Sequence, residues 1–322
     1  MEHKASITAL MSSFGRAFHA ENEEHPVFAD LFAKNLMTAE EYAAVQGYIL
    51  SGAQFFEPDI DPAAFQPTEL LRRLVNVHIA PSPLCRAAYT EKALKTSVRT
   101  GAKQYVILGA GLDTFAFRET AFLSKHRVFE VDHPLTQADK RERIARAGWT
   151  VPENLTFVPV DFTKDSLTER LIAAGFAPSV KSFFSWLGVT YYLSLEAIGS
   201  TLSALSGLRA DGSALVFDYP DESFFDAPEK RVQNTILMAK AGGEPMQSAF
   251  SYGGNYEKHE PIDRLLRTGL RNLRRPHCNN YKRQRPARED CRPVDKAQRG
   301  NDHSGNDQLH RLPHRRSQNA LL

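Results

Sequence analysis

Cysteine is scarce in this chain of 322 residues, which contains three: Cys85, Cys278 and Cys291. Three cysteines do not form a disulfide framework, and no Cys/His grouping has the spacing of a metal site, so we expect no metal. Long apolar runs are also missing. No segment reaches the length of a membrane span, and residues 1–20 are amphipathic rather than apolar, unlike a signal peptide. These absences favour a cytoplasmic protein that does not engage a membrane.

The chain as a whole also lacks a strong excess of one charge, because its formal net charge is +2. The distribution is uneven, however. Residues 271–322 hold about thirteen Lys or Arg against five Asp or Glu, so the first 270 residues carry roughly −6. A mildly acidic body has no electrostatic footprint for nucleic acid, and we expect none as a partner. The hydrophobic content of 42% is sufficient for a sizeable core.

Two kinds of hydrophobic periodicity divide the rest of the chain. Residues 1–100 are mainly helical and form a predicted N-terminal cap, whereas residues 101–270 alternate between apolar strands and helices. The predicted strands are Gln104–Leu108, Arg127–Val131, Leu155–Val160, Ser182–Leu187 and Ser213–Asp218, with helices Thr136–Ala147, Asp165–Ala174 and Leu195–Gly207 between them. Five near-continuous apolar strands separated by helices predict an α/β fold with a doubly wound, Rossmann-like parallel sheet.

Within the cap, Thr38 and Glu41 have the spacing of a capping box at the start of a helix. Helical patterns follow at Glu69–Val77 and Leu84–Val98, and the proline-rich stretch 80–83 is expected to break the chain between them. A stripe of aromatic residues is best explained as packing. It consists of Phe14, Phe18, Phe28 and Phe32.

The strand–helix rhythm stops near residue 270. Residues 271–322 are basic, poor in apolar residues and without any period, a composition that predicts disorder. Three explanations stay open: a natural basic tail, a lost reading frame near residue 270, or an RNA-binding tail, although Tyr281 is its only aromatic residue. In each case the final strands of such a sheet are missing from the pattern.

The most informative motif is YVILGAGLDT at residues 105–114, followed by VFEVD at 128–132. An apolar strand, a glycine turn, a helix and a second strand ending in an acid form a nucleotide pocket, with the acid accepting hydrogen bonds from ribose hydroxyls. The third glycine of a dinucleotide fingerprint is absent. Asp113 stands at the turn instead, where a carboxylate repels a pyrophosphate but suits an ammonium or sulfonium ligand such as S-adenosylmethionine.

Four motifs in order resemble the leucine carboxyl methyltransferase-like family of class I S-adenosylmethionine-dependent O-methyltransferases. They are YVILGAGLDTFAFR (105–118), VFEVDHP (128–134), FVPVDF (157–162) and SFFSWLGVTYYL (182–193), with weaker matches at RAFH (16–19) and PLCR (83–86). The resemblance covers roughly residues 4–270 and is closest to the bacterial branch, which is associated with polyketide and other secondary-metabolite methylation. It implies methyl transfer to a hydroxyl or carboxylate of a small molecule.

The resemblance also implies roles for individual residues. Gly109 and Gly111 lie under the methionine moiety of the cofactor, and Asp113 orients its amino group. Asp132 accepts both ribose hydroxyls, with Glu130 as the reserve candidate. Asp161 and Phe162 contact the adenine of the cofactor, and Arg86 neutralises the cofactor carboxylate. One departure is Leu187, which stands where eukaryotic members have a glutamate.

The catalytic base, the acceptor and the oligomeric state are left unassigned by the sequence. A carboxylate acceptor needs no base, whereas a hydroxyl acceptor could use His19, His133 or a tyrosine. Tyr191 and Tyr192 are equally well explained as acceptor-pocket or core residues. Two alternative functions stay open: a methyltransferase-fold remnant impaired by its atypical end, and a nicotinamide-dependent oxidoreductase.

Overall fold

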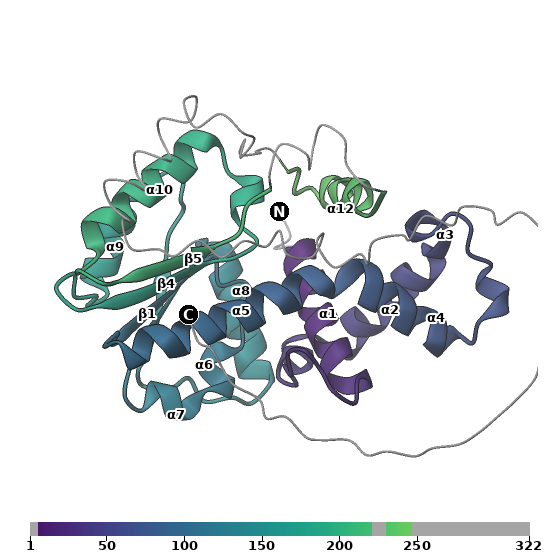
Figure 1. Ribbon diagram of the computed structural model, residues 1–322, viewed down its shortest axis with the longest axis horizontal. Coiled ribbons are helices and arrows are strands. Elements are labelled where there is room, and N and C mark those ends of the chain that lie inside the picture. Colours follow the sequence, from purple (N-terminus) through teal and green to yellow (C-terminus); the bar gives the residue numbers. More distant parts are fainter. Residues whose placement is uncertain (1–5, 221–229, 247–322) are drawn as a thin grey trace, which may run out of the picture. The chain divides into compact units, whose positions relative to one another are not determined.

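The computed structural model describes residues 6–220 and 230–246, all of which fall in one compact unit (Figure 1). Its centre is a five-stranded sheet in the order β3-β2-β1-β4-β5 with every pairing parallel. The strands are β1 (Gln104–Leu108), β2 (Arg127–Asp132), β3 (Leu155–Pro159), β4 (Ser182–Trp186) and β5 (Ala214–Phe217). This confirms the predicted α/β doubly wound fold, and each strand boundary differs from its prediction by no more than one residue.

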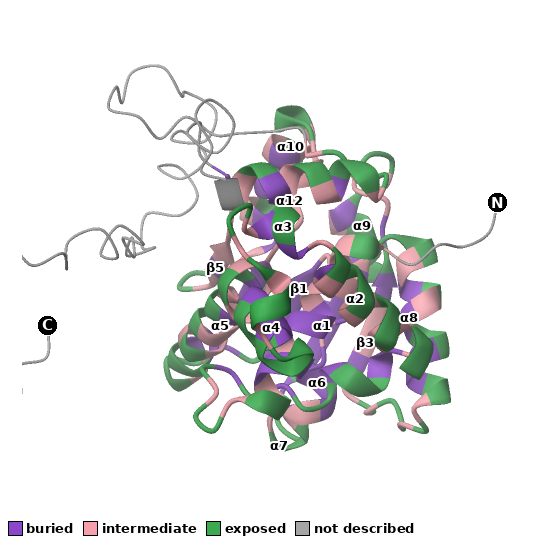
Figure 2. Ribbon diagram, turned by 90° about the vertical axis from the view of Figure 1, so that its right-hand side faces the viewer, coloured by how far each residue is buried: buried purple, intermediate pink, exposed green. Residues whose placement is uncertain are grey.

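Helices cover both faces of the sheet, as its apolar strands require. On one face lie α5 (Pro81–Arg99), α6 (Phe115–Arg118), α7 (Thr120–Leu123) and α8 (Pro134–Arg146), which share a core with the outward side chains of β1 and β2. On the other face lie α9 (Leu167–Ala173) and α10 (Leu195–Leu208), which pack against Val106, Phe129 and Phe184. Figure 2 shows the buried residues concentrated between these layers.

The N-terminal elements build a separate apolar core beside the sheet. They are α1 (Ile7–Asn22), η1 (Ala33–Leu36), α2 (Ala39–Ser51), α3 (Ala53–Phe56), η2 (Pro62–Ala64), α4 (Pro67–Leu74) and η3 (Val75–Ile79). Two further elements are η4 (Thr190–Tyr192) and α12 (Lys230–Ala241), and Met238 of α12 packs against this N-terminal core. The predicted capping box is confirmed, since Thr38 and Glu41 each accept a backbone N–H of the other.

Three local details differ from the expectations. The helix does break as predicted, since η3 ends at Ile79, but Pro81 and Pro83 belong to the first turn of α5, where proline gives up no hydrogen bond. The segment before them continues α4 as a π-turn, η3, which ends at Ile79. Phe32 is 37% exposed and contacts Trp149, whereas the other three aromatic residues of the predicted stripe are buried.

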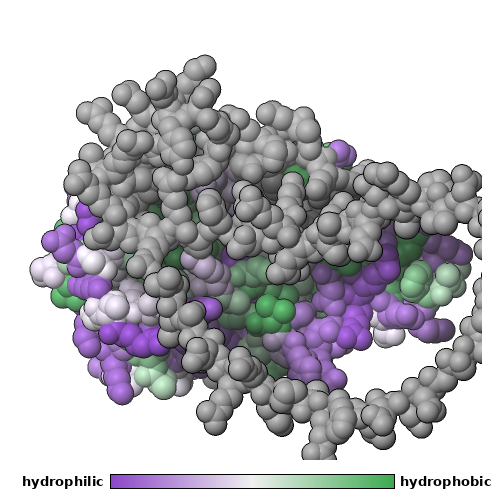
Figure 3. Space-filling view, viewed as in Figure 1, coloured by the Kyte–Doolittle hydropathy of each residue, from purple (hydrophilic) through white to green (hydrophobic). Residues whose placement is uncertain are grey.

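The described surface mixes polar and apolar side chains. Figure 3 shows hydrophilic areas flanking a smaller apolar area on one face. In the described residues, no helix is long and apolar enough to cross a membrane, and no cluster of His, Cys, Asp or Glu is arranged to hold a metal ion. The predicted tail, 271–322, lies outside the described residues, and the division of the compact unit at residue 100 stays a prediction.

Candidate cofactor and acceptor site

A cavity of about 750 Å³ opens at the carboxyl ends of β1, β2, β3 and β4. Its other walls come from α1, η3, the start of α5, η4 and α12. In an open parallel sheet, ligands bind where the chain reverses its direction of winding, which here is between β1 and β4. All seven residues that the sequence singled out for a cofactor border this one cavity: Arg86, Gly109, Gly111, Asp113, Asp132, Asp161 and Phe162.

The glycine turn after β1 needs glycine for two different reasons. Gly109 and Gly111 have φ values of +67° and +47°, a region that side-chain-bearing residues avoid. A Cβ on Gly109 would also lie 2.2 Å from Cγ2 of Val189, so the bare backbone is what keeps the turn and the η4 segment this close. Asp113 closes the turn, because its Oδ1 accepts the backbone N–H of Phe115 at 2.7 Å.

Asp132 ends β2 with its carboxylate turned toward the glycine turn. Oδ2 accepts the N–H of Gly111 at 2.5 Å, and Oδ1 accepts the N–H of His133 at 2.7 Å. Burial raises the pKa of Asp132, while the two backbone N–H groups oppose that rise. Each oxygen retains a second lone pair, so the group can still accept two hydroxyls from a ligand.

Glu130, the reserve candidate, takes no part in the cavity wall. It is 1% exposed and its Oε2 pairs with Nζ of Lys140, which lies on α8 and is equally buried. Burial raises the pKa of Glu130 to about 7, although Lys140 acts in the opposite direction. Two residues apart on one strand, Glu130 and Asp132 face the same side, but Gln137 and Lys140 of α8 bond to the first, whereas the second borders the cavity.

Asp161 and Phe162 follow β3 and form a polar and an apolar wall. Oδ1 of Asp161 accepts both the N–H and the hydroxyl of Thr163, which together with Lys164 hold the pKa of that carboxyl well below its usual range. Phe162 lies with its ring centroid 6.2 Å from that of Trp186. Asp161 does not cap the next helix, since Ser166 does so.

Arg86 reaches the cavity from α5. Its Nη1 lies 3.3 Å from Oδ2 of Asp218, and its Nη2 lies 3.5 Å from Oγ of Ser12. Asp218 follows β5 and also accepts the N–H of Gly188 at 2.6 Å. Leu187 borders the cavity at the position where the sequence departs from the family. The carboxylate of Asp218 lies beside this position, since it bonds to the next residue, Gly188.

The side chains considered as bases lie in different places. His19 is not part of the cavity wall: its Nδ1 faces Asn76 and its Nε2 accepts the N–H of Val27. His133 borders the cofactor end, where its Nε2 is 3.9 Å from Asp161. Tyr191 and Tyr192 do line the cavity, and burial is the first cause that raises the pKa of each hydroxyl.

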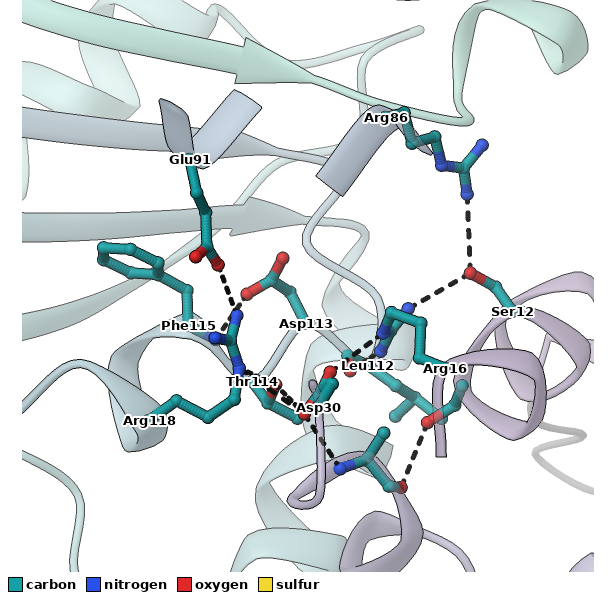
Figure 4. Close-up of polar contacts among 12 residues, drawn as sticks. Ser12, Arg16, Asp30, Arg86, Glu91, Leu112, Asp113, Thr114, Phe115 and Arg118 are labelled. Carbon is teal, nitrogen blue, oxygen red and sulfur yellow. Dashed lines mark hydrogen bonds and ion pairs between the residues drawn. The ribbon is translucent and has the colours of Figure 1, made fainter. Parts of the chain in front are cut away.

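The sequence missed an ion-pair network beneath the glycine turn, drawn in Figure 4. Asp30, which is 1% exposed, pairs with Arg16 of α1 at 2.9 Å and with Arg118 of α6 at 3.4 Å. It also accepts the hydroxyl of Thr114 at 2.7 Å, and Arg16 donates to the carbonyl of Leu112 at 2.8 Å. The network therefore ties the N-terminal cap to the glycine turn. Arg16 lay in a weak motif match, but no local pattern marked Asp30.

Apolar side chains of the cap and α12 also border the cavity. Met11, Phe28, Ile79 and Met238 border it from the cap and α12. At its rim, the N–H and hydroxyl of Thr8 donate to Oε2 of Glu244 at 3.1 and 2.6 Å, which joins the start of α1 to the segment after α12.

Comparisons with known proteins agree with this arrangement. The family model described as leucine carboxyl methyltransferase matches residues 9–206. "Putative S-adenosyl-L-methionine-dependent methyltransferase YktD" of Bacillus subtilis strain 168 is 41% identical over 254 residues, which are 78% of this chain and 83% of that protein. A protein of Mycolicibacterium paratuberculosis with the same general name is 30% identical, covering 73% and 71%.

A solved structure of a DUF574 family protein from Streptomyces avermitilis shares 14% identity, with a TM-score of 0.44 and coverage of 75% of this chain and 79% of that one. We draw no conclusion from a structural likeness this distant. The relatives found by sequence identify the cofactor, and they exclude a nicotinamide-dependent oxidoreductase. The cofactor is S-adenosylmethionine, and the chain belongs to the leucine carboxyl methyltransferase family of S-adenosylmethionine-dependent methyltransferases.

Proposed function

We propose that this methyltransferase acts on an oxygen, the hydroxyl or carboxylate of a small molecule, of the kind found in secondary metabolism. The observation that carries the proposal is the continuity of the cavity. One space of about 750 Å³ is bordered both by the strand ends and by side chains of the cap and α12, and this volume lies within the range for small-molecule pockets. If the cofactor lies at the strand ends, the part of the cavity beside the cap remains free for a methyl acceptor.

The residues at the strand ends fit the cofactor in this proposal. Gly109 and Gly111 border the cavity with backbone alone, which suits the close approach of a ligand. Asp132 has unused lone pairs for two ribose hydroxyls, and Phe162 offers an apolar surface to a base. The guanidinium of Arg86 would pair with the carboxylate of the cofactor, and the carboxylate of Asp113 would face the ammonium group of the cofactor.

When bound, S-adenosylmethionine supplies a methyl group that is already activated for in-line displacement. The protein contributes alignment of the acceptor and exclusion of water. The Thr8–Glu244 contact closes part of the rim, and the apolar side chains of the cap and α12 disfavour water inside. Tyr191 and Tyr192 line the cavity, where their side chains would contact an acceptor.

An oxygen acceptor is supported by the family's own name, which refers to methylation of a carboxyl group. A hydroxyl acceptor suits the same tyrosines. The geometry favours neither of these two oxygen classes at this stage.

Transfer of a labelled methyl group tests the proposal. The full chain is incubated with S-adenosylmethionine carrying an isotopic methyl, and separately with small carboxylic acids, phenols and amines. Methyl esters release labelled methanol in mild base, whereas methyl ethers and N-methyl products do not, so the product class is read directly. We expect labelled esters or ethers, and none with Asp132→Ala.

Transfer to amines alone would overturn the oxygen assignment. Binding of S-adenosylmethionine without transfer to any acceptor class would favour the remaining alternative, a chain that keeps the cofactor site without activity. Isothermal titration of the same preparation separates that case from a preparation that binds nothing.

A further inference from the structure

His78 occupies an unusual backbone position at the acceptor end of the cavity. It lies in the π-turn η3, where the N–H of Ala80 bonds to the carbonyl of Val75, one residue further back than in an α-helix. Such turns are rare and occur frequently at functional sites. Here the turn inserts between α4 and α5 and places His78 in the cavity wall beside Ile79.

The two ring nitrogens of His78 have different surroundings. Nε2 lies 3.2 Å from Oε1 of Glu57. Glu57 is itself held by the guanidinium of Arg73 at 2.8 and 2.9 Å, and this contact is the first cause that lowers the pKa of Glu57, so its carboxylate stays ionised. An ionised carboxylate can only accept, and Nε2 therefore carries the ring hydrogen.

Nδ1 of His78 is consequently an acceptor, and it has no hydrogen-bond partner. The side chain is 9% exposed and the nitrogen itself is out of contact with water. A buried polar atom left unpaired costs about 1–3 kcal/mol, so its retention in a cavity wall calls for an explanation. An acceptor that displaces the neighbouring side chains would pair with it, as catalytic hydrogen bonds often form only in the complex.

One charged group contacts this histidine, and others lie on the elements packed against it or line the same cavity. Arg73 of α4 reaches it through Glu57, while Arg16 of α1 and Arg86 of α5 border the same cavity. The ring also packs against Phe56, with centroids 5.5 Å apart. A ring oriented by a carboxylate through one nitrogen, with the other left bare, is the arrangement of a general base.

We infer that His78 is the general base of the reaction, positioned by Glu57, and that the acceptor is a hydroxyl such as a phenol or enol. This rests on the proposed function and narrows its acceptor class. The acceptor oxygen bonds to the methyl carbon as the carbon–sulfur bond breaks and its electron pair stays on sulfur. The hydroxyl proton passes to Nδ1 and is later released to solvent.

The tautomer of His78 provides a test that needs no acceptor. Nitrogen-15 NMR of the full chain with labelled histidines, bound to S-adenosylhomocysteine, reports which ring nitrogen carries hydrogen. The His78 signals are assigned by their loss in His78→Gln. We expect hydrogen on Nε2 and a bare Nδ1. Hydrogen on Nδ1 would overturn the inference, because that nitrogen could not accept a proton.

Kinetics provide the second test, with phenols of graded acidity and benzoate as acceptors. His78→Ala should methylate phenols roughly 10²- to 10⁴-fold more slowly than the parent, with the largest loss for the least acidic phenols. Added imidazole should restore part of this rate. Glu57→Gln should show a smaller loss of the same kind. The affinity for S-adenosylmethionine should not change, and His25→Ala, at an exposed site outside the cavity wall, should match the parent.

The outcomes separate the two proposals. If the parent enzyme methylates only carboxylates, or if His78→Ala slows phenols and benzoate equally, the base assignment is wrong while oxygen methylation stands. If the parent methylates amines alone, the proposed function fails first. A normal rate of phenol methylation in His78→Ala would also reject His78 as the base.

Discussion

Asp132 shows how one side chain can serve both the turn and the ligand. Its carboxylate already holds two backbone N–H groups, and two ribose hydroxyls would use its remaining lone pairs. Hydrogen bonds to a charged group contribute about 1.5–3 kcal/mol each, so Asp132→Ala should weaken binding of S-adenosylmethionine by about a hundredfold or more. Isothermal titration measures this, with exposed Asp211→Ala as the control. Unchanged affinity in a folded Asp132→Ala protein would remove Asp132 from the site.

At Gly109, the cost of an unfavourable backbone conformation can be measured separately from the cost of a side-chain clash, by comparison with Gly148. Alanine at a positive φ costs about 1–2 kcal/mol by itself. Gly148 has a φ of +70° with no atom within 4 Å of an added Cβ, so Gly148→Ala should show that cost alone. Gly109→Ala adds a clash with Val189 and should lose about 2–4 kcal/mol of unfolding free energy in urea, with weaker cofactor binding. Val189→Ala added to Gly109→Ala should recover part of the loss; equal losses at the two glycines would contradict the crowding argument.

At the scale of elements, Asp30 joins α1, α6 and the glycine turn. Its removal leaves two arginines, each with a side chain only 12% exposed, without their shared buried carboxylate, which should lower the unfolding free energy by about 3–5 kcal/mol. Cofactor affinity should fall as well, because Thr114 loses its partner. The matched control is Glu21→Ala, which breaks an exposed ion pair with Lys34 and should lose at most about 1 kcal/mol. Equal losses in urea unfolding would show that burial does not distinguish the two pairs.

The same elements show what sequence patterns can and cannot predict. Strand boundaries were predicted to within one residue because buried parallel strands are continuous apolar runs with polar flanks. The sequence correctly places the glycine turn and Asp132 beside one another, because their spacing alone puts them at adjoining strand ends. Asp30 and His78 were not found, since each acts through partners that are distant in the chain, Arg118 for one and Glu57 for the other.

Local composition can also mislead about elements. The prolines at 80–83 are predicted to separate two helices, and Pro81 takes the first position of the second helix, directly after the π-turn η3. Glu130 was kept as a candidate because it shares a face with Asp132, but it bonds to Lys140 of α8, whereas Asp132 borders the cavity. Neither result follows from a residue and its immediate neighbours, since both depend on another element.

At the scale of the whole molecule, two sets of carboxyl groups predict opposite trends of stability with pH. Glu23, Glu41 and Glu57 have pKa values lowered by arginine partners, that of Glu23 to about 2. Below pH 4.5 these three groups bind more protons in the unfolded chain than in the folded protein, so stability rises as the pH increases toward 4.5. Glu130, with its pKa raised from 4.5 to about 7 by burial, keeps a proton that the unfolded chain has already released.

Stability should therefore fall as the pH rises from about 4.5 to about 7, because in this window the folded state binds more protons than the unfolded state. The optimum is expected near pH 5, and urea unfolding midpoints between pH 3 and pH 8 measure it. Glu130→Gln combined with Lys140→Met removes both buried charges and should flatten the fall above pH 5 while leaving the acidic limb unchanged. A parent protein that gains stability up to pH 7, or a double variant that shows the same fall, would mean that Glu130 is ionised throughout this range by its contact with Lys140.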